Sequence, residues 1–362
     1  GIQLQHETAE TLPLRNFQQY MDWISRLEKL DDVIDQYIAL ANQGIENQVM
    51  PPKVLMSRVL NQIKLQNVDS YINSPFYDAF EFLPDEISNQ EQEQIREQAQ
   101  ITITNVVIPS YVKLLNFFEN SYYPNCRDTI GISDIKNGSQ YYELIARQFT
   151  TTELTPDEIH NIGLSEVSRI KNEMFKIMDQ VQWNGSFDEF LDFLRTDSQF
   201  YFETGEELFT EYLATSKRID PLLVKLFKDL PSMPYGLKPI PMESAPDTTT
   251  AYYQRPAADG SRAGYYYVNL YMPEVRPKYE IEALSLHEAM PGHHLQIAYT
   301  MELDLPNFRK YGGYTAFVEG WGLYAESLGE DLGMYKDPYS KFGQLTYEMW
   351  RAVRLVVDTG MH

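Results

Sequence analysis

The spacing of apolar residues predicts that the first 240 residues are mainly helical. Apolar side chains recur at three- and four-residue intervals from position 14 to about 44, which is typical of an amphipathic helix. The same spacing predicts further helices over 51–66, 85–124, 151–181, 186–197 and 204–227. Thr155, Pro156 and Glu158 form a helix start signal, because threonine and glutamate make a capping box and proline suits the first turn. Pro109 predicts a kink or break in the stretch 85–124.

A different pattern begins near residue 232. The segment up to Pro277 is rich in proline, tyrosine and turn residues, and residues 264–271 have the β-branched and aromatic content of a strand. The turn "ADGSRAG" introduces this strand. Helical spacing then returns over 278–303, about 313–330 and about 338–357, and the last helix is expected to end at Thr359-Gly360.

These patterns predict a mainly α fold with a short β-strand region just before the helix 278–303. We expect a helical part, 1–240, and a part that carries the chemistry, 241–362, joined as one continuous domain.

Composition narrows the function classes. The 362 residues include 52 acidic and 30 basic side chains, a formal charge of −22, whereas nucleic-acid binding needs a basic surface. No apolar run approaches the roughly 20 residues needed to span a bilayer. The chain does not start with a basic segment followed by an apolar one, so we expect any export signal to have been removed. Cys126 is the only cysteine, which excludes an internal disulfide and a multi-cysteine zinc site.

Three of the six histidines lie within "ALSLHEAMPGHHLQIAY", residues 283–299. Isolated histidines are usually ordinary surface or core residues, and His6 and His160 are interpreted in this way. A cluster of His287, His293 and His294 around a glutamate in an apolar helix is instead typical of a metal site.

The spacing of these histidines does not fit a straight helix. In the motif His-Glu-x-x-His, two imidazoles one turn apart reach the same zinc ion. His293 follows His287 by six residues and falls on the wrong face, while His294 lies about 10 Å further along the axis. Pro291 and Gly292 permit a bulge that would return one of the pair to the required position. We therefore expect a bent helix, with His293 or His294 as the second ligand.

Catalytic zinc commonly has three protein ligands and a water molecule. Glu319 is the candidate third ligand, since it lies among apolar residues on a later predicted helix, where Gly320 and Gly322 permit close packing. Glu326, seven residues on and on the same face, is expected to orient a ligand. Glu288 is placed to act as general base on a zinc-bound water.

The chain resembles the bacterial family known as domain of unknown function 885, DUF885. Its motif His-Glu-Ala-x-Pro-Gly-His-His-Leu-Gln matches His287 to Gln296. Further matches are "RDTIGI", "DGSRAGYYYVNLYMPEVRP", "EGWGLYAESLG" and "RAVRLVVDTGMH", so the resemblance covers about 120–362. Family members usually continue past this last segment, which implies a longer protein.

That family is similar to the helical zinc peptidases exemplified by angiotensin-converting enzyme and oligopeptidases. The resemblance implies a zincin-like fold, with one zinc ion per chain bound by His287, His293 and Glu319, and it favours His293 over His294. It also implies that His362 stabilises the oxyanion. A location in the bacterial periplasm or cell envelope, with an N-terminal lipid anchor outside residues 1–362, is expected by the same resemblance.

The preferred function is a zinc peptidase that cleaves short peptides. An extended substrate could pair with the edge of the strand 264–271. Tyr266, Tyr267, Arg351 and Arg354 are candidate contacts to the oxyanion or to a peptide carboxylate. The alternatives are a zinc hydrolase of other amides or esters, and a catalytically silent binding protein. Retention of Glu288 disfavours the latter, because a structural zinc needs no base.

Overall fold

The computed structural model describes residues 1–242, 244–257, 260 and 262–362. The expected turn "ADGSRAG" includes residues 258, 259 and 261, which lie outside the described residues. Helices dominate the fold and only three short strands are described, so the prediction of a mainly α protein with a small β region is confirmed. The described residues form two compact units, Gly1–Gln140 with His362, and Tyr141–Met361. The division expected at residue 240 stays a prediction.

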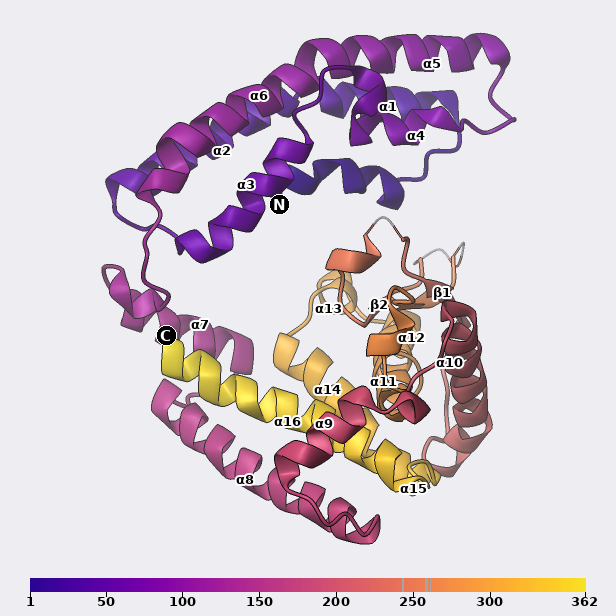
Figure 1. Ribbon diagram of the computed structural model, residues 1–362. Helices are drawn as coiled ribbons and strands as arrows, with labels where there is room; N and C mark the ends of the chain where they lie inside the picture. Colours follow the sequence, from indigo (N-terminus) through magenta and orange to yellow (C-terminus); the bar gives the residue numbers. More distant parts are fainter. Residues whose placement is uncertain (243, 258–259, 261) are drawn as a thin grey trace. The chain divides into compact units, whose positions relative to one another are not determined.

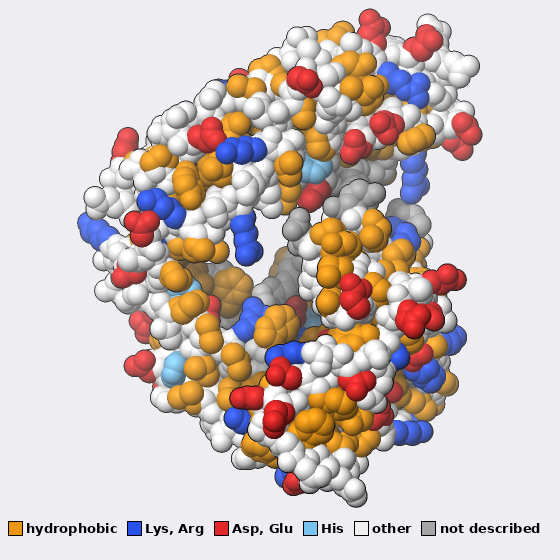
Figure 2. Space-filling view, in the orientation of Figure 1, with side chains coloured by type: hydrophobic (Ala, Val, Ile, Leu, Met, Phe, Trp, Pro, Cys, Tyr) orange, Lys and Arg blue, Asp and Glu red, His pale blue; other side chains and the backbone are white. Residues whose placement is uncertain are grey.

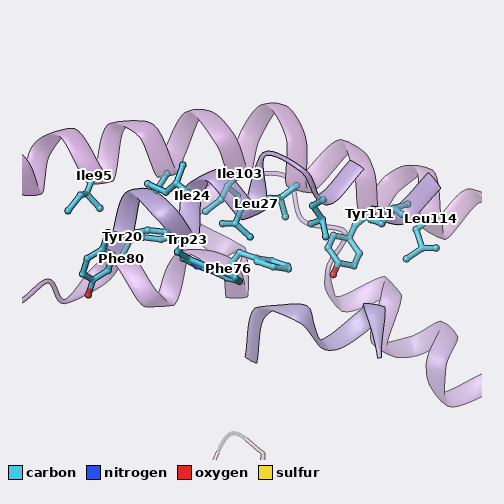
Figure 3. Close-up of a cluster of buried hydrophobic side chains, with 14 of the residues drawn as sticks. Tyr20, Trp23, Ile24, Leu27, Phe76, Phe80, Ile95, Ile103, Tyr111 and Leu114 are labelled. Carbon is cyan, nitrogen blue, oxygen red and sulfur yellow. The ribbon is translucent and has the colours of Figure 1, made fainter. Parts of the chain in front are cut away.

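The first unit is built from helices around an aromatic and aliphatic core. Its main helices are α1 (Phe17–Leu27), α2 (Leu30–Glu46), α3 (Lys53–Leu65), α4 (Asp78–Glu81), α5 (Asn89–Thr102) and α6 (Ile108–Phe117). Figure 3 shows the core side chains that α1, α5 and α6 direct toward one another, among them Trp23, Ile95 and Tyr111. Burial of such side chains stabilises the unit by about 1.5–3 kcal/mol for each large apolar residue.

The predicted helix from 14 to about 44 is wrong as a single element. Lys29 has non-helical backbone angles and separates α1 from α2, so that Leu27 and Leu30 are both buried. The sequence has no glycine or proline at this break. The break is determined by the burial of side chains from both helices and not by local helix propensity, so the spacing of apolar residues does not reveal it.

The stretch from α5 to α6 contains the expected irregularity near Pro109. A π-helical turn, Ile103–Val107, joins the two helices, and the Ile108 amide donates to the Ile103 carbonyl. The helical run Asn89–Asn125 is long and apolar enough to cross a membrane by length and composition alone. Core helices pass the same test, and the side chains of Ile95, Ile103 and Tyr111 are fully buried within the first unit.

The second unit carries the remaining main helices and all three described strands. Its helices begin with α7 (Gly138–Thr150), which straddles the boundary between the units. They continue with α8 (Pro156–Gln180), α9 (Phe187–Thr196), α10 (Gly205–Ile219), α11 (Ile281–Glu288), α12 (His293–Glu302), α13 (Asn307–Tyr311), α14 (Thr315–Ser327), α15 (Gly329–Leu332) and α16 (Pro338–Met361). The predicted capping box of α8 is confirmed, with Thr155 and Glu158 bonded reciprocally. Helix α16 lies along α8 (Figure 1), where Gly163 leaves space for the Leu355 and Val356 side chains.

Two features of α16 differ from expectation. The helix continues through Thr359 and Gly360 to Met361, and Gly360 does not adopt the left-handed conformation of a terminating glycine. The predicted end at Thr359-Gly360 is therefore wrong. Contacts of the last turn with α8 explain the extension, since His160 Nδ1 lies 2.9 Å from Thr359 Oγ1.

The strands β1 (Tyr235–Pro239), β2 (Ala251–Gln254) and β3 (Gly264–Val268) form one sheet in the order β1-β3-β2. Strand β3 pairs in parallel with β1 and antiparallel with β2. The predicted strand 264–271 thus ends at Val268 and is the central strand, with both edges already hydrogen-bonded. The expectation that its edge pairs with a substrate is wrong, because β3 is paired on both sides and the edge strands of the described sheet are β1 and β2.

The surface reflects the acidic composition. On the face shown in Figure 2, lysine and arginine side chains are dispersed among acidic ones rather than gathered into one basic surface. That face lacks the concentrated positive charge on which phosphate-backbone binding depends.

Close packing of α16 makes a first prediction. A Cβ atom at Gly343 would lie 2.0 Å from the Tyr279 carbonyl oxygen, so Gly343→Ala should lower the free energy of unfolding by about 3 kcal/mol. Gly360→Ala, in the same helix, meets its nearest atom at 3.5 Å and should change stability by less than about 1 kcal/mol. Urea unfolding of both variants measures the difference, and equal stabilities would contradict the packing described.

Candidate metal centre

The motif helix is broken rather than bent. Helix α11 ends at Glu288 and α12 begins at His293, so the predicted continuous helix 278–303 is wrong. Ala289 and Gly292 have non-helical backbone angles, and the Met290–Pro291 peptide bond is cis. A Cβ atom at Gly292 would lie 1.8 Å from the His287 carbonyl oxygen, so only glycine fits there. The break brings the His293 ring to a centroid distance of 4.6 Å from the His287 ring.

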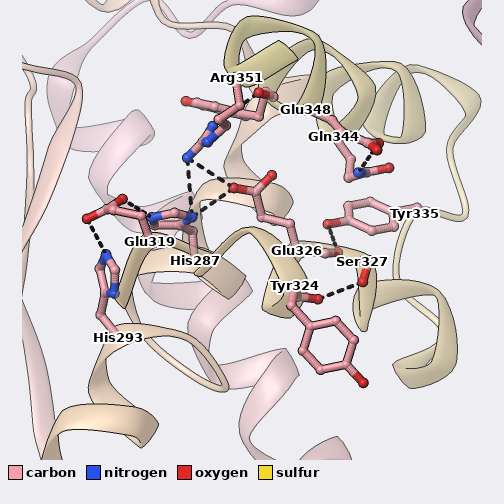
Figure 4. Close-up of polar contacts among 11 residues, drawn as sticks. His287, His293, Glu319, Tyr324, Glu326, Ser327, Tyr335, Gln344, Glu348 and Arg351 are labelled. Carbon is pink, nitrogen blue, oxygen red and sulfur yellow. Dashed lines mark hydrogen bonds and ion pairs between the residues drawn. The ribbon is translucent and has the colours of Figure 1, made fainter. Parts of the chain in front are cut away.

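Three side chains meet beside this break. His287 Nε2 lies 3.6 Å from one carboxylate oxygen of Glu319, and His293 Nε2 lies 3.8 Å from the other. One ligand atom from each residue falls within 4.8 Å of the others (Figure 4). Zinc–ligand bonds near 2.0–2.1 Å separate neighbouring ligand atoms of a tetrahedron by about 3.3 Å. These donors therefore fit a zinc ion, or another divalent metal that accepts two imidazoles and a carboxylate.

A buried carboxylate orients His287 from the opposite side. Glu326 is 1% exposed, and its Oε1 lies 2.8 Å from His287 Nδ1. A carboxylate accepts, so Nδ1 donates to Glu326, and Nε2 is the ring nitrogen that faces Glu319. Arg351 Nη2 lies 3.3 Å from the same Glu326 oxygen and holds it in place. This arrangement matches the carboxylate–histidine pairs that orient metal ligands in proteins.

The electrostatics of the two histidines differ. Burial lowers the pKa of His287, but the hydrogen bonds to Glu319 and Glu326 outweigh it and raise the pKa to about 9. The carboxylates that favour a proton on this ring equally favour a metal cation beside it. Burial and the adjacent His287 lower the pKa of His293, so this ring stays neutral and keeps a lone pair for a ligand bond.

A glycine allows α14 to approach α11. A Cβ atom at Gly322 would lie 2.5 Å from the His287 ring, so the imidazole packs directly on the α14 backbone. A Cβ atom at Gly320 would have no other atom within 4 Å. Gly320 therefore does not contribute to the close packing of helices that the sequence analysis expected of it. Gly322 thereby places Glu319 and Glu326, on either side of it in sequence, against His287.

His294 has a different environment from His293. Its Nε2 lies 3.0 Å from the Met233 carbonyl oxygen and its Nδ1 lies 2.8 Å from the Tyr253 hydroxyl. Both ring nitrogens are therefore engaged away from His287 and Glu319. Sequence analysis left His293 and His294 open as alternatives, and the geometry favours His293. Tyr253 and Met233 were missed, because no spacing or motif links them to the histidines.

Glu288 is the buried carboxylate closest in sequence to these ligands. It is 8% exposed, and burial raises its pKa to about 7 although the charge on His287 opposes this shift. A carboxylate with a pKa near neutrality exchanges protons efficiently under physiological conditions. This protonation behaviour suits a general base.

The two candidate tyrosines lie on opposite faces of the sheet, because side chains alternate along a strand. Tyr266 is fully buried against Tyr212, and burial raises its pKa well above the ordinary value. Tyr267 is half-buried and stacks on Tyr252 on the other face. Tyr266 therefore packs in the core and is not exposed to a substrate, and the two tyrosines cannot line one site together.

Arg351 and Arg354, the two candidate arginines on α16, also have different surroundings. Arg351 reaches the Glu326 carboxylate, whereas Arg354 is exposed and stacks on Trp350. His362 follows Arg351 by eleven residues, about 16 Å along a helix, and its Nδ1 accepts a hydrogen bond from the Ile132 amide. The catalytic role of His362 stays a prediction.

The fold and site define a mainly helical protein with a candidate metal centre of two histidines and a glutamate. The chain belongs to the family described as "Bacterial protein of unknown function (DUF885)", whose model matches residues 2–362. The match thus includes the first 120 residues, where sequence analysis found no shared motif.

Two solved structures are similar to the chain. A putative lipoprotein from Colwellia psychrerythraea is 31% identical, with a TM-score of 0.91, over 97% of this chain and 62% of that one. A putative lipoprotein of unknown function from Shewanella oneidensis is 18% identical, with a TM-score of 0.61, over 95% of this chain and 62% of that one. This chain therefore spans about three fifths of either length. No curated protein matches it.

The contact between His287 and α14 makes the second prediction. Gly322→Ala should displace the His287 ring and weaken zinc binding by about 10-fold or more, because ligands must be held closely in position. Gly320→Ala, two residues away in the same helix, meets open space and should bind zinc like the parent protein. Competition with a chelator measures both affinities. Equal affinities would show that the Gly322 contact does not shape the site.

Proposed function

We propose that this protein is a zinc-dependent hydrolase that cleaves short peptides. The observation that carries the proposal is the convergence of His287 Nε2, His293 Nε2 and a Glu319 carboxylate beside the buried carboxylate of Glu288. Two imidazoles and one carboxylate leave a tetrahedral zinc ion with an open position, which is typical of catalytic rather than structural sites. A zincin-like ancestry, implied by the sequence motif, is in keeping with this donor set.

The residues divide the chemistry between them. When bound, zinc would supply Lewis acidity that lowers the pKa of a water molecule and polarises a substrate carbonyl. Glu288 accepts the proton of the attacking water and can return it to the leaving amine. Glu326, which Arg351 contacts, accepts from His287 Nδ1 and so leaves Nε2 as the ring nitrogen available to a metal.

We assign peptide binding to an edge strand of the sheet, β2, because β3 is the central strand. Strand β2 is an edge strand of the described sheet and packs against α11, which ends at Glu288. Main-chain hydrogen bonds to such an edge accept many side-chain sequences, which suits short peptides of varied composition. Arg351, partly exposed beside the site, is the candidate contact to the oxyanion or a peptide carboxylate.

A location in the cell envelope is part of the proposal. The similar Colwellia psychrerythraea protein is described as a putative lipoprotein, and it is identical to this chain at nearly one third of positions. An N-terminal lipid anchor outside residues 1–362 would retain such a hydrolase at a membrane surface.

Metal analysis is the first test. Protein purified without chelator should contain about one zinc per chain, and His287→Ala or Glu319→Ala should remove most of it because each supplies a ligand atom. His160→Ala, a histidine bonded to Thr359 in the same unit, should retain the full zinc content. Full occupancy in the His287 and Glu319 variants would refute the ligand set.

Turnover is the second test. Glu288→Gln should keep zinc and the fold while lowering peptide hydrolysis roughly 10²–10⁴-fold, since a lost general base costs about that much. Glu282→Gln, on the same helix but bonded to the Tyr335 amide, should hydrolyse peptides nearly as the parent does. Parallel assays with ester substrates distinguish peptidase from esterase activity. Unchanged peptide hydrolysis by Glu288→Gln would remove Glu288 from the mechanism.

A further inference from the structure

The two ring nitrogens of His293 have different surroundings: Nε2 faces Glu319, and Nδ1 points away from it. Its Nδ1 is buried and makes no hydrogen bond among the described residues, whereas the Nδ1 of His287 is held by Glu326. A metal ligand usually donates this second ring nitrogen to an orienting group. The direction of the His293 ring therefore depends on its packing against His287 and on the backbone that carries it.

That backbone is not fixed by α11. The hydrogen-bond ladder stops at the four-residue break, Ala289–Gly292, and α12 starts anew at His293. Across the break the His294 amide donates to the Ala289 carbonyl at 3.1 Å. This backbone hydrogen bond restrains the rotation of α12 about its axis less than an unbroken ladder would, and Gln296 Nε2, which donates to the Phe317 carbonyl of α14, adds a second restraint. A rotation of α12 would carry His293 away from Glu319.

The adjacent side chain, His294, resists this rotation. A carbonyl oxygen can only accept, so Nε2–H of His294 donates to Met233, and Nδ1 accepts from the Tyr253 hydroxyl. The ring is 2% exposed and packs against the Tyr235 ring at a centroid distance of 4.9 Å. Both ends of the imidazole are therefore attached to the sheet region, one through β2 and the other through the segment before β1.

Two further features belong to the same attachment. A Cβ atom at Gly264 in β3 would lie 2.3 Å from the Tyr253 hydroxyl and 2.9 Å from His294 Nδ1, so glycine makes room for this hydrogen bond. At the other end of α12, Glu302 accepts hydrogen bonds from the Met233 amide and the Ser232 hydroxyl. Residues at both ends of α12, His294 and Glu302, thus bond to the backbone of Met233, one to its carbonyl and the other to its amide.

We infer that His294 and Tyr253 are positioning residues for the metal centre. They attach α12 to the sheet and so direct the neighbouring His293 toward His287 and Glu319. Adjacent residues of a helix differ by about 100° in direction, so anchoring the His294 ring fixes where His293 points. This inference rests on the proposed metal site and adds a role for the second histidine of the pair, which binds no metal itself.

Zinc affinity tests the inference in the full chain. His294→Ala should still bind about one zinc at saturation, but about 10–100-fold more weakly in chelator competition, as for other residues that orient ligands. Tyr253→Phe removes one hydroxyl and keeps the ring, so it should weaken zinc several-fold. His294→Asn retains an acceptor for Tyr253 and should recover part of the loss.

A stability control separates positioning from general destabilisation. Leu194→Ala removes a buried side chain of α9 that belongs to a different part of the core, and should lower the melting temperature without changing zinc affinity. Unchanged affinity in both His294→Ala and Tyr253→Phe would overturn the inference. Complete loss of zinc from His294→Ala at saturating metal would overturn it too, by making His294 a ligand. Absence of zinc from the parent protein would instead refute the proposed function.

Discussion

The packing of the His287 imidazole on the Gly322 backbone is the contact on which the site depends. It brings α14 so close to α11 that no side chain fits between them, and two carboxylates of α14 then meet the same ring from either side. Glu326 takes Nδ1 and Glu319 faces Nε2, so one helix supplies both the orienting group and a ligand. The seven-residue spacing puts Glu319 and Glu326 on one face of α14, and the close approach at Gly322 places the His287 ring between them.

The charge balance of this region favours a cation. Glu288, Glu319 and Glu326 gather around two imidazoles, and Arg351 is the basic side chain that contacts them in the part of the chain described. Three carboxylates in a partly buried region repel one another, and burial raises the pKa of Glu288. A divalent cation between His287, His293 and Glu319 would neutralise two charges and lower this cost.

Local signals in the sequence account for the parts that were predicted. The capping box at Thr155, the strand at Gly264–Val268 and the pairing of His287 with Glu319 and Glu326 follow from residue type and spacing. The break at Lys29, the central position of β3 and the environment of His294 depend on contacts between distant segments. Propensity and periodicity carry no information on such contacts, which is why a bent helix was expected where two helices occur.

A break in a buried helix normally leaves backbone amide and carbonyl groups without hydrogen-bond partners. At this break, some of the carbonyl groups have found other partners. The Trp321 indole donates to the Pro291 carbonyl at 2.8 Å, and the Gln296 amide donates to the Gly292 carbonyl at 3.1 Å. Tertiary contacts from α14 and the first turn of α12 thus replace part of the interrupted ladder. Departures from regular structure persist where they serve a site and are stabilised by the surroundings. Here the departure brings the His293 ring to a centroid distance of 4.6 Å from the His287 ring, so that both imidazoles can face one ion.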